Sequence, residues 1–354
     1  MNSKPMLNGP TLKGVQLLAG ISLGLIVGGC SWFAWLPGVG DGGLKDDSDS
    51  SEPIKLEKFI AEADVRVIWK RGVGQGLGKK YVRLVPSVVA ERIVAADAYG
   101  GVFAFDRFNG KVIWANQFDP KNKKGFGLRA LLDRKDPSFV SGGLSTGDEL
   151  IFLGTTKGEI VALNVTDGTE SWRTQVGTEI GSSPAVGDDE VFVHTIDDRL
   201  SALDVNDGRV IWTADNQMPL LTLRGTASPT YAQGVVFSGT AGGKIAALRG
   251  ENGEPIWEQR LVLPEGTSEL DRMVDVDASP LVSGSTVYGL AYQGNLVAFN
   301  RRDGRPLWQV QLSGFQDMAE GYGQIYVVNE SDRILALDKE TGEISWESES
   351  FLRR

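Results

Sequence analysis

Residues 202–212 read Ala-Leu-Asp-Val-Asn-Asp-Gly-Arg-Val-Ile-Trp, and three of these positions recur along the chain. In each copy an alanine is followed six residues later by a glycine, and the glycine four residues later by a tryptophan. The copies run from Ala104 to Trp114, Ala162 to Trp172, Ala202 to Trp212, Ala247 to Trp257, Ala298 to Trp308 and Ala336 to Trp346. Successive tryptophans are 58, 40, 45, 51 and 38 residues apart. The spacing within each unit is therefore constant, whereas the connections between units vary in length. This is typical of a repeat fold.

The repeat predicts β-strands. Apolar and β-branched residues form short runs such as Val191–Val193, and no long amphipathic helix is indicated between residues 80 and 350. Asn or Asp usually precedes the repeat glycine, a pair that favours the positive φ of a tight hairpin. Four short strands per unit, with a tryptophan in the last, predict an all-β propeller of four-stranded blades. We expect the tryptophans to pack between neighbouring blades.

Composition excludes several classes of protein. The chain of 354 residues has one Cys, so it forms no intramolecular disulfide, and one His, so it holds no His-rich metal site. Its formal net charge of −10 has the wrong sign for a nucleic-acid-binding protein. Gly143–Gly147 fits the G-x-S-x-G pattern, but no helix is predicted after it, and the lone His194 falls in a strand pattern. A hydrolase site is therefore not expected.

The N-terminus has the layout of a secretory signal. Lys4 and Lys13 precede the apolar run Val15–Val27, which is too short for a comfortable membrane span. The run ends in Val27-Gly28-Gly29-Cys30, which resembles a bacterial lipobox. That resemblance implies cleavage after residue 29, lipidation of Cys30 with palmitate among the acyl groups, and passage to the outer membrane. Residues 30–60 are expected to carry the lipidated cysteine and a flexible tether.

The repeat resembles that of the pyrroloquinoline-quinone (PQQ) dehydrogenases and their non-enzymatic relatives. With the lipobox, the chain is similar to the BamB family, the propeller lipoproteins of the β-barrel assembly machinery. The more specific stretches are Trp69–Gly76, Ile180–Val186, Leu221–Gly225 and Glu269–Asp277. The resemblance implies a non-catalytic scaffold with no cofactor or metal. It would be anchored by lipid to the periplasmic face of the outer membrane and would assist the folding and insertion of barrel proteins.

The blade count departs from that family, whose propellers have eight blades. Six complete modules are found here, preceded by an orphan strand, Val65–Trp69, whose tryptophan matches the blade-ending ones. We therefore expect residues 61–354 to form an incomplete ring and the C-terminus to be truncated.

Two unusual connections mark the expected binding region. Leu221 and Leu223 share one side of an extended segment, Arg224 lies beside them, and Asp275 and Asp277 share one side of the next such connection. The resemblance implies that these five residues contact the periplasmic POTRA domains of BamA. The alternative, also open, is that Arg224 and the aspartates form an internal ion-pair network. Unfolded outer membrane proteins are a further expected partner.

Two other functions remain as alternatives. A PQQ-dependent dehydrogenase would hold its quinone and Ca²⁺ with acidic and amide ligands near the propeller axis, and no such cluster is found outside the turns. A glycan-binding propeller also stays open, since the sequence does not separate exposed from buried aromatic residues.

Overall fold

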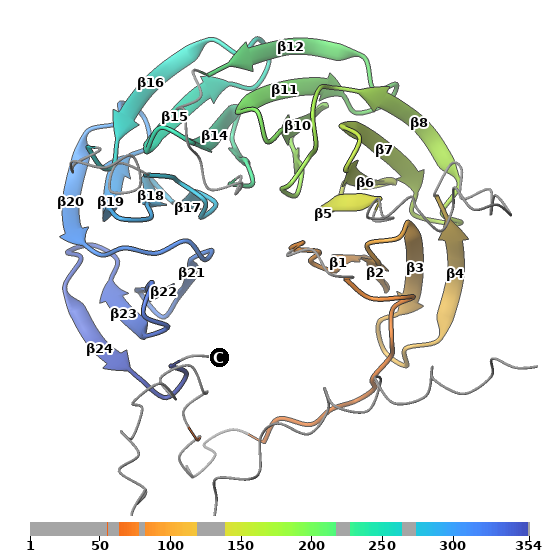
Figure 1. The fold of residues 1–354 in the computed structure, drawn as a ribbon, viewed down its shortest axis with the longest axis horizontal. Helices are drawn as coiled ribbons and strands as arrows, with labels where there is room; N and C mark the ends of the chain where they lie inside the picture. The colour runs from red at the N-terminus through yellow and green to blue at the C-terminus, as the bar shows by residue number, and fades with distance from the viewer. Residues whose placement is uncertain are drawn as a thin grey trace, which may run out of the picture. The chain divides into compact units, whose positions relative to one another are not determined.

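The computed structural model describes residues 55, 64–77, 82–118, 139–216, 227–263 and 274–352. They belong to one compact unit, Pro53–Arg354. Within these ranges the regular elements are β-strands in six four-stranded sheets, which follow one another around an arc (Figure 1). The predicted all-β class with PQQ-like blades is confirmed. The predicted signal segment and all of the predicted tether except Lys55 lie outside the described residues. Among the residues described, no helix is long and apolar enough to cross a membrane.

The strands pair in chain order within each sheet, as successive antiparallel hairpins. The first two sheets contain β1 (Ser87–Val89), β2 (Arg92–Ala96), β3 (Gly101–Asp106), β4 (Val112–Gln117), β5 (Val140–Thr146), β6 (Leu150–Thr155), β7 (Glu159–Asn164) and β8 (Glu170–Gln175). The next two contain β9 (Ala185–Val186), β10 (Glu190–His194), β11 (Arg199–Asp204), β12 (Val210–Asp215), β13 (Thr230–Ala232), β14 (Val235–Thr240), β15 (Lys244–Arg249) and β16 (Pro255–Arg260). The last two contain β17 (Leu281–Ser283), β18 (Thr286–Leu290), β19 (Asn295–Asn300), β20 (Pro306–Gln311), β21 (Ala319–Gly321), β22 (Gln324–Val328), β23 (Ile334–Asp338) and β24 (Ile344–Ser348).

The alanine of the repeat is the cross-strand partner of its tryptophan. Ala202 on β11 lies opposite Trp212 on β12, and the same pairing holds in the other five sheets. A register shift follows the alanine each time, so the last strand carries a bulge beside the ring. A methyl group opposite the indole leaves room for the largest side chain on the same face of the sheet.

The glycine of each repeat packs against the ring of the tryptophan that precedes its sheet in the chain. Each repeat glycine has φ between +66° and +76°, and a Cβ added to it would lie closer than 3.0 Å to a tryptophan ring. That tryptophan also donates its indole N–H to a backbone carbonyl in the same turn, over 2.6 to 3.1 Å. The residue before the glycine does not share its positive φ. At Asp207, for example, the carboxylate instead accepts the N–H of Arg209. We call this arrangement the tryptophan–glycine clasp.

The clasps join, in order, Trp69 to Gly110, Trp114 to Gly168, Trp172 to Gly208, Trp212 to Gly253, Trp257 to Gly304 and Trp308 to Gly342. Each of these six tryptophans packs against a glycine turn outside its own sheet. In the first clasp the Trp69 indole N–H donates to Arg107 O over 2.9 Å.

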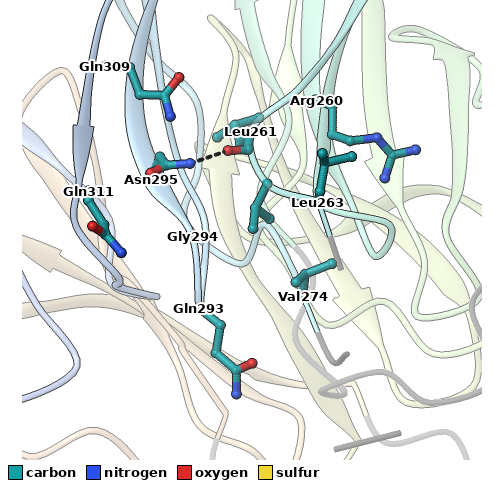
Figure 2. A pocket seen from close by; sticks show the side chains of 10 residues that line it. Arg260, Leu261, Leu263, Val274, Gln293, Gly294, Asn295, Gln309 and Gln311 are labelled. Carbon is teal, nitrogen blue, oxygen red and sulfur yellow. Dashed lines mark hydrogen bonds between the residues drawn. The ribbon is translucent and has the colours of Figure 1, made fainter. Parts of the chain in front are cut away.

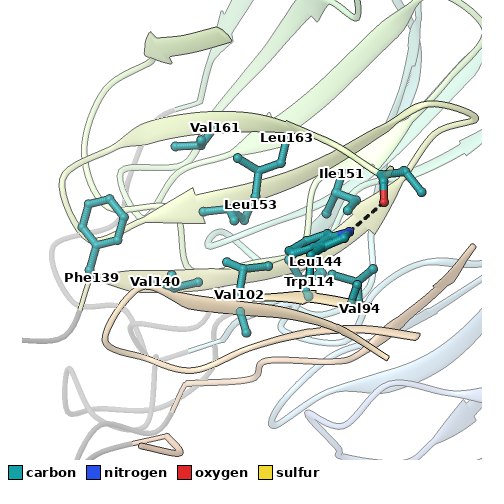
Figure 3. Close-up of a cluster of buried hydrophobic side chains, with 13 residues drawn as sticks. Val94, Val102, Trp114, Phe139, Val140, Leu144, Ile151, Leu153, Val161 and Leu163 are labelled. Atoms are coloured by element: carbon teal, nitrogen blue, oxygen red, sulfur yellow. Dashed lines mark hydrogen bonds between the residues drawn. The ribbon is translucent and has the colours of Figure 1, made fainter. Parts of the chain in front are cut away.

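The core is divided among the junctions between sheets. Five clusters of buried side chains each draw on two successive sheets. On β6, Ile151 and Leu153 pack toward the first sheet while Phe152 packs toward the third. Both faces of the inner strands are therefore buried, which explains why they read as continuous apolar runs. Figure 3 shows the first of these clusters, where the Trp114 indole N–H donates to the carbonyl of Val165 across the junction.

The two ends of the arc differ from the expectation. The orphan segment Val65–Trp69 is not a strand, and its apolar residues Val65, Val67 and Ile68 are exposed, because no described strand lies beside it to pair with. At the other end Trp346 is 45% exposed, whereas Trp114, Trp172 and Trp257 are 7–9% exposed. Among the described residues, no glycine turn covers Trp346.

The glycine-rich link after Trp69 is held against the first sheet. Asp97 is 2% exposed, and one of its carboxylate oxygens accepts the N–H of Gln75 over 2.9 Å. Its other oxygen accepts the N–H groups of Tyr99 and Gly101. A Cβ on Gly74 would overlap this carboxylate, so the glycine is required by a close approach.

We predict that Gly304→Ala destabilises the fold far more than Gly234→Ala. Both glycines have positive φ, +69° and +81°, so both variants lose about 1 kcal/mol through the backbone. Only at Gly304 would the new methyl group lie 2.7 Å from the Trp257 ring, which adds about 1–3 kcal/mol. Denaturant unfolding of both variants measures the difference. Equal losses would show that the clasp is not tightly packed.

Candidate functional site

The expected binding region is described only in part. Leu221, Leu223 and Arg224 fall in residues 217–226, and Cys30 falls in residues 1–54; both ranges lie outside the described residues. Asp275 and Asp277 are described, directly after the range 264–273, which is not. The described part of the region consists of the residues at which the two connections begin and end.

Asp275 and Asp277 are buried, with 2% and 8% exposure. The sequence places both residues in the expected interaction patch but does not say whether their side chains face solvent, and the structure turns both inward. The physical reason is the short bridge that Asp275 makes with Tyr292, whose N–H donates to the Asp275 carbonyl over 2.9 Å. It draws the segment onto the fifth sheet, where Val276 joins the buried cluster beneath β18 and β19.

The two carboxyls form a buried acidic pair. Burial, then the charge of Asp277, then that of Asp198 raise the pKa of Asp275 to about 8. Burial raises the pKa of Asp277 to about 6, and the positive charge of Arg83 partly opposes that shift. Asp275 Oδ2 and Asp277 Oδ1 are buried and accept no hydrogen bond from a described residue. Such a pair is complementary to a cationic group, since a nearby positive charge would favour the ionised form.

A second buried pair lies on the hairpin between β10 and β11. His194 Nε2 and Asp198 Oδ1 are 2.9 Å apart, and the side chains are only 2% and 3% exposed. The charge of Asp198 acts on Asp275, so the two pairs belong to one electrostatic group. Sequence reasoning placed His194 in a strand but missed this pairing. The signal that could have found it is His194, which stands where the other sheets have Ala96, Gly154, Gly239, Leu290 and Val328.

A polar hollow adjoins the second connection. Its volume is about 640 Å³, and its walls include Leu263 and Val274, the last described residues on either side of 264–273. Figure 2 shows the amides of Gln293, Gln309 and Gln311 around it, with Asn295 Nδ2 donating to the carbonyl of Leu261 over 2.8 Å. Amide groups both donate and accept hydrogen bonds, which suits an uncharged polar surface such as a polypeptide backbone. Within the described ranges no group of three His, Cys, Asp or Glu residues is arranged to hold a metal ion.

Comparison with known proteins identifies the family. The family model described as "Outer membrane protein assembly factor BamB" matches residues 100–348, which cover almost all of the six sheets. The chain belongs to the BamB family. A BamB from Xanthomonas campestris is 39% identical over 343 residues, which is 97% of this chain and 81% of that protein. The family resemblance predicted from the repeat and the lipobox is thereby confirmed.

Solved structures agree on the fold. BamB from Moraxella catarrhalis superposes with a TM-score of 0.67 at 24% identity, covering 77% of each chain. A quinohemoprotein alcohol dehydrogenase from Pseudomonas putida reaches a TM-score of 0.55 at 14% identity, over 76% of this chain and 52% of that one. At these identities both likenesses show the fold alone. The BamB assignment rests on the sequence matches.

We predict that Asp275→Asn flattens the pH dependence of stability. Because the pKa of Asp275 is higher in the folded chain than in the unfolded one, folding takes up a proton and stability falls as pH rises from about 4 to about 8. The variant should gain about 1–3 kcal/mol over the parent near pH 8 and change little near pH 5. Urea unfolding at several pH values measures this.

Asp148→Asn is the matched control, because Asp148 is an exposed aspartate in a turn. Parallel pH profiles for the parent and Asp275→Asn would contradict the buried acidic pair.

Proposed function

We propose that this chain is a non-catalytic scaffold lipoprotein of the outer membrane β-barrel assembly complex. In this role it binds the POTRA domains of BamA and assists the folding and insertion of β-barrel proteins into the outer membrane. The observation that carries the proposal is the BamB match across residues 100–348, with a relative named as an assembly factor aligned over 97% of the chain.

The structural roles of the repeated residues support a scaffold function. The alanine, glycine and tryptophan positions are occupied by packing between sheets, and the buried aromatic residues lie within the same junctions. Two buried polar pairs are not required by the repeat: His194–Asp198 on the hairpin between β10 and β11, and Asp275–Asp277 at the end of the second connection. Residues that packing does not explain are the better candidates for function.

We place the partner-binding region on these connections. Leu221, Leu223 and Arg224 supply the contact side chains, with the leucines as apolar anchors and the guanidinium as a planar donor for a carboxylate. Asp275 and Asp277 are buried, so their part is to attract a cationic group to the region. That group is either Arg224 or a basic side chain of BamA.

The anchor completes the proposal. Cys30 is the only cysteine and falls at the lipobox position, which favours lipidation there and attachment to the periplasmic face of the outer membrane. Unfolded outer membrane proteins are a further partner. No cofactor, metal or nucleic acid takes part in this role.

We predict that Cys30→Ser abolishes incorporation of labelled palmitate and moves the chain from the membrane fraction to the soluble periplasm. Stable membrane attachment takes more than one acyl chain. Because Cys30 is the expected site of lipidation, its loss should release nearly all of the protein. Labelling and fractionation of cells producing either form measure the effect. Equal membrane retention of the two forms would place the anchor elsewhere.

We predict that Arg224→Glu weakens binding to the purified POTRA array at least about tenfold, because one charged hydrogen bond is lost and a repulsion is added. Arg302→Glu makes the same change of charge at an exposed turn between β19 and β20 and should bind like the parent. Pull-down and titration of the mature chain test this. Equal binding by all three forms would remove Arg224 from the contact, and no binding by the parent would end the proposed function.

A further inference from the structure

Four of the six sheets carry an ion pair at the same place, between the residue three before the repeat alanine and the last strand. The pairs are Glu159 with Arg173, Arg199 with Asp215, Lys244 with Glu258 and Arg333 with Glu347. In the fifth sheet the first of these positions is Asn295, and the corresponding residues on β20 are Gln309 and Gln311. The fifth sheet therefore has uncharged amides where those four sheets have an ion pair.

Gln311 also differs from the glutamines that occupy its position in the first two sheets, three residues after the tryptophan. Gln117 Nε2 donates to the carbonyl of Tyr99 over 2.7 Å, and Gln175 Nε2 donates to that of Lys157 over 2.8 Å. The side chains of Gln309 and Gln311 make no hydrogen bond with a described residue. Their amides are therefore available to a ligand.

The turn before Asn295 accounts for the missing bond. The residue with positive φ stands four positions before the repeat alanine in the other five sheets: Gly100, Gly158, Asp198, Gly243 and Asp332. In the fifth sheet it is Gln293, one position earlier, with φ of +52°. A glutamine there carries a conformational cost that glycine avoids. Tyr99 and Lys157, whose carbonyls accept the other two glutamines, stand at the position of Gln293, so the altered turn removes this acceptor from Gln311.

The unbonded amides face apolar side chains across the hollow of about 640 Å³ beside β20. Figure 2 shows Gln309 and Gln311 on one side of this hollow and Leu263 and Val274 on the other. Leu263 is 65% exposed. The volume is typical of ligand pockets, which occupy about 300–1,000 Å³. The hollow thus combines an amide wall with an apolar wall.

The chemistry of these walls favours an uncharged ligand that forms hydrogen bonds and has one apolar side. Arg260 is the one charged residue among the described residues that line the hollow, and its Nη1 donates to the carbonyl of Gly242 over 3.3 Å. None of these lining residues is aromatic, so they offer no ring for a sugar to stack on. An extended polypeptide fits both walls, because its backbone offers N–H and C=O groups and its side chains alternate between two sides.

We infer that this hollow binds an extended polypeptide in which apolar and polar residues alternate. Gln309 and Gln311 form hydrogen bonds with its polar side, and Leu263 and Val274 contact its apolar side chains. The strands of outer membrane barrels have this alternation. The inference rests on the proposed function only for the source of the polypeptide, which is an unfolded β-barrel protein.

The first experiment measures binding of a fluorescent peptide to the mature chain by anisotropy. The peptide has about ten residues, the length of one barrel strand, and Leu alternates with Ser. The parent should bind it at least about tenfold more tightly than a peptide of the same composition with all Leu residues in one half, because only the alternating peptide has one apolar and one polar side. Equal affinity for the two peptides, or no binding by the parent, would overturn the inference.

A pair of double variants tests the amide wall. Gln309→Ala/Gln311→Ala should weaken binding of the alternating peptide at least about tenfold, because two hydrogen bonds are lost. The matched control is Gln117→Ala/Gln175→Ala, which removes two glutamines that are bonded within their own sheets and should bind like the parent. Denaturant unfolding checks that both variants are folded. Equal affinity of the two variants would contradict the role of the amides.

The second experiment locates the peptide. A benzophenone at its centre should form adducts on β20, Leu263 or Val274 on irradiation, as mapped by mass spectrometry. Adducts confined to other sheets would overturn the inference. Maltoheptaose, a neutral oligosaccharide, should not displace the peptide, and displacement would make the hollow a sugar site instead.

Titration with the POTRA array separates this inference from the proposed function. A parent chain that binds the array but not the peptide would overturn the inference alone. A parent chain that binds the peptide in the hollow but not the array would support the inference and end the proposed function.

Discussion

An indole ring packed against a glycine of the next sheet is the contact on which the rest of this structure depends. It fixes the distance and the rotation between neighbouring sheets, because the ring leaves no room for a Cβ and its N–H must reach a carbonyl in the same turn. The alanine opposite the tryptophan and the bulge beside it follow from seating the ring, and the apolar strands fill the space that the clasp defines. Three residue types at fixed spacing thus specify both the sheet and its attachment to the next one.

Much of this was predictable from the spacing alone. The period of the alanine, glycine and tryptophan positions gave the number of complete sheets and the packing role of the tryptophans. It did not reveal that each glycine packs against a tryptophan outside its own sheet, because that contact joins residues 34 to 54 positions apart. The pattern also did not predict the structure of the segment before the first sheet. A strand needs a neighbour to pair with, which Val65–Trp69 lacks among the described residues, and the glycines after Trp69 are held by the buried carboxylate of Asp97.

The candidate site was less predictable, because the sequence pattern does not show which of its side chains are buried. The alternation that places Asp275 and Asp277 on one side of an extended segment does not say whether that side faces solvent. Here the bridge to Tyr292 turns it inward. His194 and Asp198 are four residues apart, and their pairing depends on a left-handed backbone at Asp198 that single-sequence patterns do not show. Comparing equivalent positions among the six sheets does indicate His194, because this residue stands where the other sheets have Ala, Gly, Leu or Val.

The division of the core into five clusters, one at each junction between sheets, has a consequence for how the molecule unfolds. Each cluster and each clasp couples a sheet only to its immediate neighbours, so the energetics approach those of a linear array with nearest-neighbour terms. A sheet in the middle is held from both sides, while the sheet that ends in Trp346 is held, among the described residues, from one side only. Opening should therefore spread inward from that terminal sheet, and amide exchange should slow progressively toward the third and fourth sheets.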